Sequence, residues 1–140
     1  GNNLSKDTAV KFSTAGTGTV YGSRRMPPTI DTSAAMKFRA IVTPDANGAA
    51  TNKVRLTVGY RAVATGGGRD FNSWQQEVSN LIDVAAWTSK TTYEVFADVT
   101  PANLPAGALV EYWLKRDKGP ADDTFGGNIW CLNFDLLASI

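Results

Sequence analysis

Histidine is absent from this sequence of 140 residues, and cysteine occurs once, as Cys131. Without histidine the chain has no Ser-His-Asp or Cys-His catalytic set and no histidine-ligated zinc or iron site. A single cysteine excludes an internal disulfide and a thiolate metal cluster within one chain. Because no histidine can activate its thiol, Cys131 is expected to be a packed residue or part of a subunit contact.

An excess of one charge and long apolar runs are also missing. The chain has 14 basic and 13 acidic residues and a net charge of +1, which gives no basic surface for nucleic acid or an anionic membrane. No apolar run approaches the length of a membrane span. We therefore expect neither a nucleic-acid nor a membrane partner. A composition of 43% hydrophobic and 19% charged residues is that of an ordinary globular chain with one core.

Alternation of apolar and polar residues is the main pattern that the sequence does contain. It is clearest over residues 53–64, where Val54, Leu56, Val58 and Tyr60 share one face. Further strands are predicted over residues 9–13, 19–22, 36–42, 91–99, 109–115 and 129–136. Residues 73–86 fit helical spacing as well as a strand, and the all-strand context favours the extended form. The last two strands, 109–115 and 129–136, are predicted to pair as a hairpin across a polar loop.

About eight strands at regular spacing, with no clear helix, predict an all-β fold and specifically an antiparallel β-sandwich. Among sandwiches, the eight-stranded jelly roll fits the strand count and the length. An immunoglobulin-like sandwich is the alternative. Residues 1–34 are expected to form an N-terminal arm with an edge strand, and residues 35–140 to form the sandwich body of a single domain.

Apolar residues on both faces of the last strands indicate a possible contact between copies of the chain. The face predicted to line the core consists of Val110, Tyr112, Leu114, Trp130, Leu132, Phe134 and Leu136. Apolar residues expected on the opposite face are the candidate oligomer interface: Phe96, Leu109, Trp113, Ile129 and Cys131. The alternative is that loops or the N-terminal arm cover these side chains within one subunit.

Three stretches carry a family resemblance: residues 54–64 (VRLTVGYRAVA), 104–117 (LPAGALVEYWLKRD) and 121–128 (ADDTFGGN), followed by the final alternating strand. They resemble β-sandwich domains of structural proteins in tailed-phage virions, in which a strand ending in Arg-Asp, an Asp-Thr loop and a closing strand recur. The similarity covers residues 36–137, and its motifs are architectural rather than catalytic.

The resemblance implies a non-enzymatic structural module of a phage virion, in capsid decoration, a tail fibre or a baseplate. Such a module would act as a homo-oligomer, for example a trimer, located in the phage particle. Its partners would be other virion proteins and, in an adhesive role, a host-surface glycan.

Other kinds of site have weaker support. Asp117, Asp122 and Asp123 are candidates for oxygen ligation of calcium, but solvated loop charge paired with Arg116 and Lys118 is favoured. The glycine-rich loop at residues 65–70 lacks the helix and the lysine of a phosphate site. Since Glu77, Glu94 and Glu111 each lie in separate strand patterns, nothing pairs two carboxylates for glycoside hydrolysis. We expect no enzymatic activity and no cofactor.

Four tryptophans and four tyrosines offer flat apolar rings on which a sugar could stack. Trp74 and Trp87 adjoin turns and are the candidate glycan contacts, although a place in the core or an interface is favoured for both. A carbohydrate-binding module on a β-sandwich scaffold is therefore the alternative function, and the fold alone does not choose between the two.

Overall fold

The structure, a computed structural model, describes residues 9–27, 36–63, 76–99, 106–119 and 121–137. These residues form eight strands, which alternate in sequence with turns and loops. Their bounds are β1 Val10–Phe12, β2 Thr19–Arg25, β3 Met36–Pro44, β4 Lys53–Val63, β5 Gln76–Asp83, β6 Tyr93–Val99, β7 Leu109–Arg116 and β8 Ile129–Leu137. None of the described segments is a helix with the length and apolar character needed to cross a bilayer.

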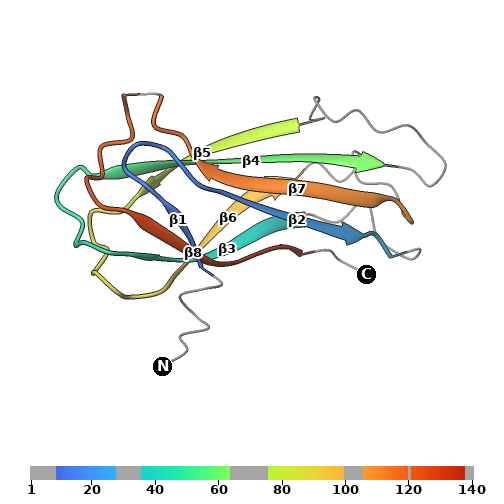
Figure 1. The fold of residues 1–140 in the computed structure, drawn as a ribbon, viewed down its shortest axis with the longest axis horizontal. Coiled ribbons are helices and arrows are strands. Elements are labelled where there is room, and N and C mark those ends of the chain that lie inside the picture. The colour runs from blue at the N-terminus through green and yellow to red at the C-terminus, as the bar shows by residue number, and fades with distance from the viewer. Residues whose placement is uncertain (1–8, 28–35, 64–75, 100–105, 120, 138–140) are drawn as a thin grey trace.

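The strands form two four-stranded sheets, with the orders β1-β8-β3-β6 and β2-β7-β4-β5. Every pairing within them is antiparallel. In Figure 1, β5, β4, β7 and β2 follow one another from top to bottom across the second sheet. The two antiparallel sheets and the absence of a helix among the described residues confirm the predicted all-β antiparallel sandwich. The chain passes repeatedly from one sheet to the other, and the resulting strand order is that of a jelly roll. An immunoglobulin-like sandwich distributes its strands differently and does not fit.

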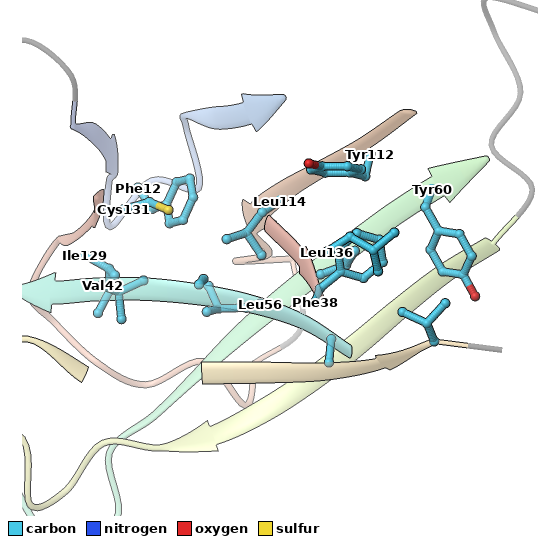
Figure 2. Close-up of a cluster of buried hydrophobic side chains, with 14 of the residues drawn as sticks. Phe12, Phe38, Val42, Leu56, Tyr60, Tyr112, Leu114, Ile129, Cys131 and Leu136 are labelled. Atoms are coloured by element: carbon cyan, nitrogen blue, oxygen red, sulfur yellow. The ribbon is translucent and has the colours of Figure 1, made fainter. Parts of the chain in front are cut away.

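The core lies between the sheets and is built from the alternating faces that the sequence predicts. Along β4, Val54, Leu56, Val58 and Tyr60 are all buried. The ring of Phe38, from β3 of the first sheet, lies 5.4 Å from Tyr60 and 5.2 Å from Tyr112, both from the second sheet, between centroids. Figure 2 shows these three rings meeting in the middle of the core. Such tilted aromatic pairs stabilise the packing of one sheet on the other.

The predicted hairpin between the last two strands is wrong. β7 pairs with β2 and β4, whereas β8 pairs with β1 and β3 in the other sheet. The polar loop between them therefore crosses from one sheet to the other. Thr124 N and Phe125 N both donate to Lys53 O, which ties the loop to the start of β4.

The predicted face of β8 is correct only in its second half. A β-bulge shifts the pairing with β3 between Ile41 and Val42, so that Cys131 pairs with Val42 and Asn133 with Ile41. One extra residue reverses the alternation of the strand, because side chains alternate with a period of two. Ile129 and Cys131 are consequently buried, with exposed fractions of 0% and 2%, although they were expected to face outward.

Beyond the bulge, Phe134 and Leu136 face the core as predicted. Trp130 and Leu132 do not: Trp130 lies beside Lys11 on the outer face, and Leu132, the extra residue of the bulge, is 40% exposed. For the ambiguous stretch at residues 73–86, the preference for extended structure is confirmed by β5. β1 and β2, from the segment interpreted as an arm, are the edge strands of the two sheets.

Candidate functional site

The outer face of the β2-β7-β4-β5 sheet carries a row of residues that crosses all of its strands. Tyr21 of β2 lies beside Trp113 of β7. On β4, Gly59 lies beside Trp113 on one side and Glu77 of β5 on the other. Since side chains alternate along a strand and Val58 is buried in the core, this row faces away from the core.

Gly59 makes room in this row for the indole of Trp113. A Cβ atom at Gly59 would lie 2.2 Å from Trp113 Cε2, far inside contact distance, so the ring rests directly against the glycine backbone. Lys115 Nζ lies 4.8 Å from the centroid of the same ring, within the range of a cation–π contact. Trp113 is only 5% exposed, and it is therefore a fixed part of the surface rather than a free aromatic platform.

A depression of about 240 Å³ opens beside Trp113, and we call it the Tyr21 depression. Its lining residues come from three strands and are Thr19, Tyr21, Glu77, Trp113 and Lys115. Tyr21 is 71% exposed, the highest value among the large hydrophobic residues that the structure describes as exposed. The depression thus presents a solvent-facing phenol ring next to a buried indole.

The charged groups of the depression differ from their neighbours on the same face. Three ion pairs involve strands of this sheet: Lys53 with Asp83 at 3.8 Å, Arg55 with Asp122 at 2.5 Å, and Arg61 with Glu111 at 3.2 Å. By contrast, Lys115 and Glu77 form no ion pair with any described residue. Within the described part of the chain, the Glu77 carboxylate and the Lys115 ammonium therefore have no partner of opposite charge, and both can hydrogen-bond a ligand.

The aspartates considered as calcium ligands serve the fold instead. Asp123 is buried and accepts hydrogen bonds from Arg116 Nε and Nη2 at 3.0 and 2.8 Å, from Lys118 Nζ at 3.0 Å and from Arg55 N at 3.1 Å. Burial alone would raise the pKa of Asp123, but these hydrogen bonds outweigh it and hold the pKa below its ordinary value. Among the described residues, no group of three potential ligands could hold a metal ion.

Of the three carboxylates, only Asp123 pairs with Arg116 and Lys118 as expected, and its setting is not a solvated loop. Arg116 is 1% exposed, and its guanidinium also donates to Gly127 O at 2.6 Å and Phe125 O at 2.5 Å. The more exposed Asp122 pairs with Arg55, whose hydrogen bonds lower the pKa of that carboxyl. Asp117 accepts a hydrogen bond from Gly119 N and does not join the cluster.

The five residues proposed for an oligomer interface do not share one surface. Phe96, 46% exposed, and Leu109, 41% exposed, lie on different sheets. Trp113 faces outward but is nearly covered, while Ile129 and Cys131 lie in the core because of the bulge in β8. Burial raises the pKa of the Cys131 thiol to about 11, as expected of a packed rather than a reactive cysteine. A contact between copies through Phe96 or Leu109 stays a prediction.

Of the two tryptophans proposed to contact a glycan, Trp74 lies outside the described residues. Trp87 is half-buried, and its ring stacks on Tyr93 with 4.5 Å between centroids and 4° between planes.

Sequence reasoning missed Tyr21, which lies in a short, weakly patterned strand. Its place in the row depends on the pairing of β2 with β7, and no local signal in the sequence indicates that pairing.

No family model matches this chain, and no curated protein matches it. Three solved structures are similar in shape. An arabinose-bound α-L-arabinofuranosidase, MgGH51, has 13% identity and a TM-score of 0.49, with 93% of this chain and 19% of that one covered. TmCBM61 in complex with β-1,4-galactotriose has 10% identity and a TM-score of 0.44, with 94% and 70% covered.

The third is the CBM22-1 xylan-binding domain of Paenibacillus barcinonensis Xyn10C, with 10% identity, a TM-score of 0.37, and 88% and 73% covered. This chain thus spans about a fifth of the arabinofuranosidase and most of each of the two smaller proteins. All three TM-scores lie below 0.5, so the function of this chain has to be argued from its own residues.

Proposed function

We propose that the protein is a carbohydrate-binding module and that the Tyr21 depression is its binding site. The observation that supports this most is the exposed ring of Tyr21 beside the unpaired polar groups of Thr19, Glu77 and Lys115. Six other charged residues on or beside this sheet are joined in three ion pairs. A concave site that combines an aromatic ring with a few unpaired polar groups is typical of small-ligand binding.

The chemistry of a sugar matches this set of groups. A pyranose ring has an apolar face of C–H groups, which stacks on an aromatic ring, and a rim of hydroxyls. With one sugar ring on Tyr21, its hydroxyls donate to the Glu77 carboxylate and accept from the Lys115 ammonium. Hydrogen bonds to charged groups contribute about 1.5–3 kcal/mol each, more than neutral ones, so these two residues orient the ligand. Trp113 holds Lys115 in place through the cation–π contact.

Affinity electrophoresis in gels containing soluble polysaccharides tests the proposal. The parent protein is expected to be retarded by at least one polysaccharide. Tyr21→Ala should abolish the retardation and Glu77→Gln should weaken it, because they remove the stacking ring and the charged acceptor. Leu132→Ala is the matched control, since it truncates an exposed apolar residue on the other sheet. Equal retardation of Tyr21→Ala and the parent protein would contradict this site.

Assembly of copies into a phage particle is the second candidate function. The observation that favours a protein contact is the exposure of Phe96 and Leu109, which lie on opposite sheets. Large apolar side chains on a surface are frequent in interfaces between subunits. A carbohydrate-binding site and an assembly contact can coexist here, because the Tyr21 depression occupies only one outer face.

A further inference from the structure

The two lateral sides of the sandwich are each bounded by two edge strands. β1 and β2 are the first strands of their sheets and lie beside each other at one side. β5 and β6 are the last strands and lie beside each other at the opposite side, where Asn80 Nδ2 donates to Phe96 O at 3.4 Å. Among the described residues, each edge strand has one row of backbone groups without a partner strand, so either side can accept a strand from another molecule.

These two sides carry charges of opposite sign. Within strands β5 and β6 every charged residue is acidic and exposed: Glu77, Asp83, Glu94 and Asp98. Within strands β1 and β2 every charged residue is basic: Lys11, Arg24 and Arg25, of which Lys11 and Arg25 are exposed. Because the whole chain is nearly neutral, this separation makes one side of the molecule electrostatically complementary to the other.

Apolar residues accompany the charges on the acidic side. Leu81 of β5 is 40% exposed and Phe96 of β6 is 46% exposed. Between the two strands, an apolar crevice reaches toward the core and is lined in part by Ile82, Val95 and Phe96. An interface at this side would therefore bury apolar area as well as pair charges, and apolar burial supplies most of the free energy of association.

We propose that a second copy of this chain docks its β1-β2 side against the β5-β6 side, so that copies associate head to tail. Each sheet has four antiparallel strands, so its first and last strands run in opposite directions. A neighbouring copy in the same orientation presents β2 antiparallel to β5 and β1 antiparallel to β6, which continues both sheets. Contacts between two different surfaces are heterologous and produce rings or filaments rather than two-fold dimers.

The same charges disfavour the symmetric alternatives. Two β5-β6 sides facing each other would bring four acidic residues of each copy together, and two β1-β2 sides would bring basic residues together. Like charges across an interface suppress the wrong pairing. The charge pattern thus selects the head-to-tail arrangement, independently of whether the Tyr21 depression binds a sugar.

A charge-swap experiment tests this proposal by light scattering and analytical ultracentrifugation over a dilution series. The parent protein should self-associate at about 10 mM ionic strength and dissociate progressively toward about 150 mM, as screening shortens the Debye length from about 30 to 8 Å. Glu94→Lys with Asp98→Lys leaves the β5-β6 side without net charge, because two lysines then balance Glu77 and Asp83. Lys11→Glu with Arg25→Glu makes the β1-β2 side acidic, because two glutamates then outweigh Arg24. Each variant alone should associate at least about tenfold more weakly than the parent.

Restoration of complementary charges is the decisive readout. An equimolar mixture of the two variants should form heterodimers, because the first variant keeps the basic β1-β2 side and the second keeps the acidic β5-β6 side. The protein with all four substitutions keeps the parent net charge of +1 but neither complementary side, and it should stay monomeric. Circular dichroism of each variant checks that the fold is retained. A parent protein that stays monomeric throughout the series at low salt would overturn the proposal. So would folded single-side variants that associate like the parent, or a mixture that remains monomeric.

Discussion

Arg116 and Asp123 form a buried bidentate ion pair that fixes the loop between β7 and β8. The side chains of both residues are fully buried. The Arg116 guanidinium donates to the Asp123 carboxylate and to the backbone oxygens of Phe125 and Gly127, all of which belong to this loop. Through Asp123 the same pair reaches Arg55 N and so attaches the loop to β4. A charge in the interior is tolerated only when it is paired and hydrogen-bonded in this way.

Asp123→Asn should lower the free energy of unfolding by about 3–5 kcal/mol, because it leaves the Arg116 guanidinium buried without its counter-charge. Urea denaturation of parent and variant at pH 7 measures the difference. Asp122→Asn is the matched control: it removes a carboxylate from an exposed ion pair one residue away and should have a much smaller effect. Equal effects of the two substitutions would show that the buried pair is not the stabilising element.

The same pair predicts a pH dependence of stability. The folded protein holds the pKa of Asp123 below its ordinary value of 3.8, so the folded state binds a proton at this carboxyl less readily than the unfolded state. The stabilisation is therefore complete above the unfolded-state pKa and is lost as pH falls through the folded-state pKa. The difference in unfolding free energy between the parent and Asp123→Asn should be constant from pH 7 to about 5 and shrink below about pH 4.

Individual residues show where sequence reasoning works and where it stops. That a loop aspartate pairs with Arg116 and Lys118 could be predicted from their proximity in sequence, but that it is Asp123 alone, and that the pair is buried, could not. A charged residue at the end of a strand is usually solvated, and only the crossing of the loop between the sheets encloses it. Tyr21 was missed for a similar reason: its neighbours in the depression come from β5 and β7, which are distant in sequence.

The face that lines the core could be predicted from the sequence for all of β4 but only for part of β8. In β4 the apolar residues alternate without interruption, so the core face could be assigned from the sequence alone. In β8 the bulge reverses the alternation, yet the sequence from Trp130 to Leu136 still shows a regular apolar pattern. A bulge depends on pairing with the neighbouring strand, so a period of two within one strand cannot reveal it.

Substitutions on either side of this bulge test the observed register. Ile129→Ala removes a fully buried side chain and should lower the free energy of unfolding by about 2–5 kcal/mol. Leu132→Ala truncates a side chain that is 40% exposed and should change stability by about 0.5 kcal/mol or less. Thermal or urea denaturation of both variants measures the order of the effects. The reverse order would support the uninterrupted alternation predicted from the sequence and would contradict the bulge.

The connection between the last two strands shows a second limit at this scale. A polar loop between two apolar strands is compatible with a hairpin and with a crossing between sheets. The length and turn residues of the loop do not separate these possibilities. The crossing is stabilised by contacts with distant residues, such as the hydrogen bond from Asp117 N to Arg55 O. Long-range contacts of this kind decide the jelly-roll order.

At the scale of the whole molecule, the number of strands and their alternation were sufficient to predict a sandwich, and the observed order makes it a jelly roll. This architecture presents two outer faces and two lateral sides. We assign the Tyr21 depression on one face to carbohydrate, and the oppositely charged sides to contact with further copies. Both proposals rest mainly on side chains outside the core, and one fold can carry many such sites.

The most direct test of the proposed function is a titration of the isotopically labelled protein with oligosaccharides, followed by amide chemical shifts in heteronuclear NMR spectra. We predict that a ligand shifts the amides of residues around Thr19, Tyr21, Glu77, Trp113 and Lys115 and leaves the outer face of the β1-β8-β3-β6 sheet unchanged. Tyr21→Ala should remove these shifts at the same ligand concentration. Shifts confined to the other face, or their persistence in Tyr21→Ala, would contradict the account.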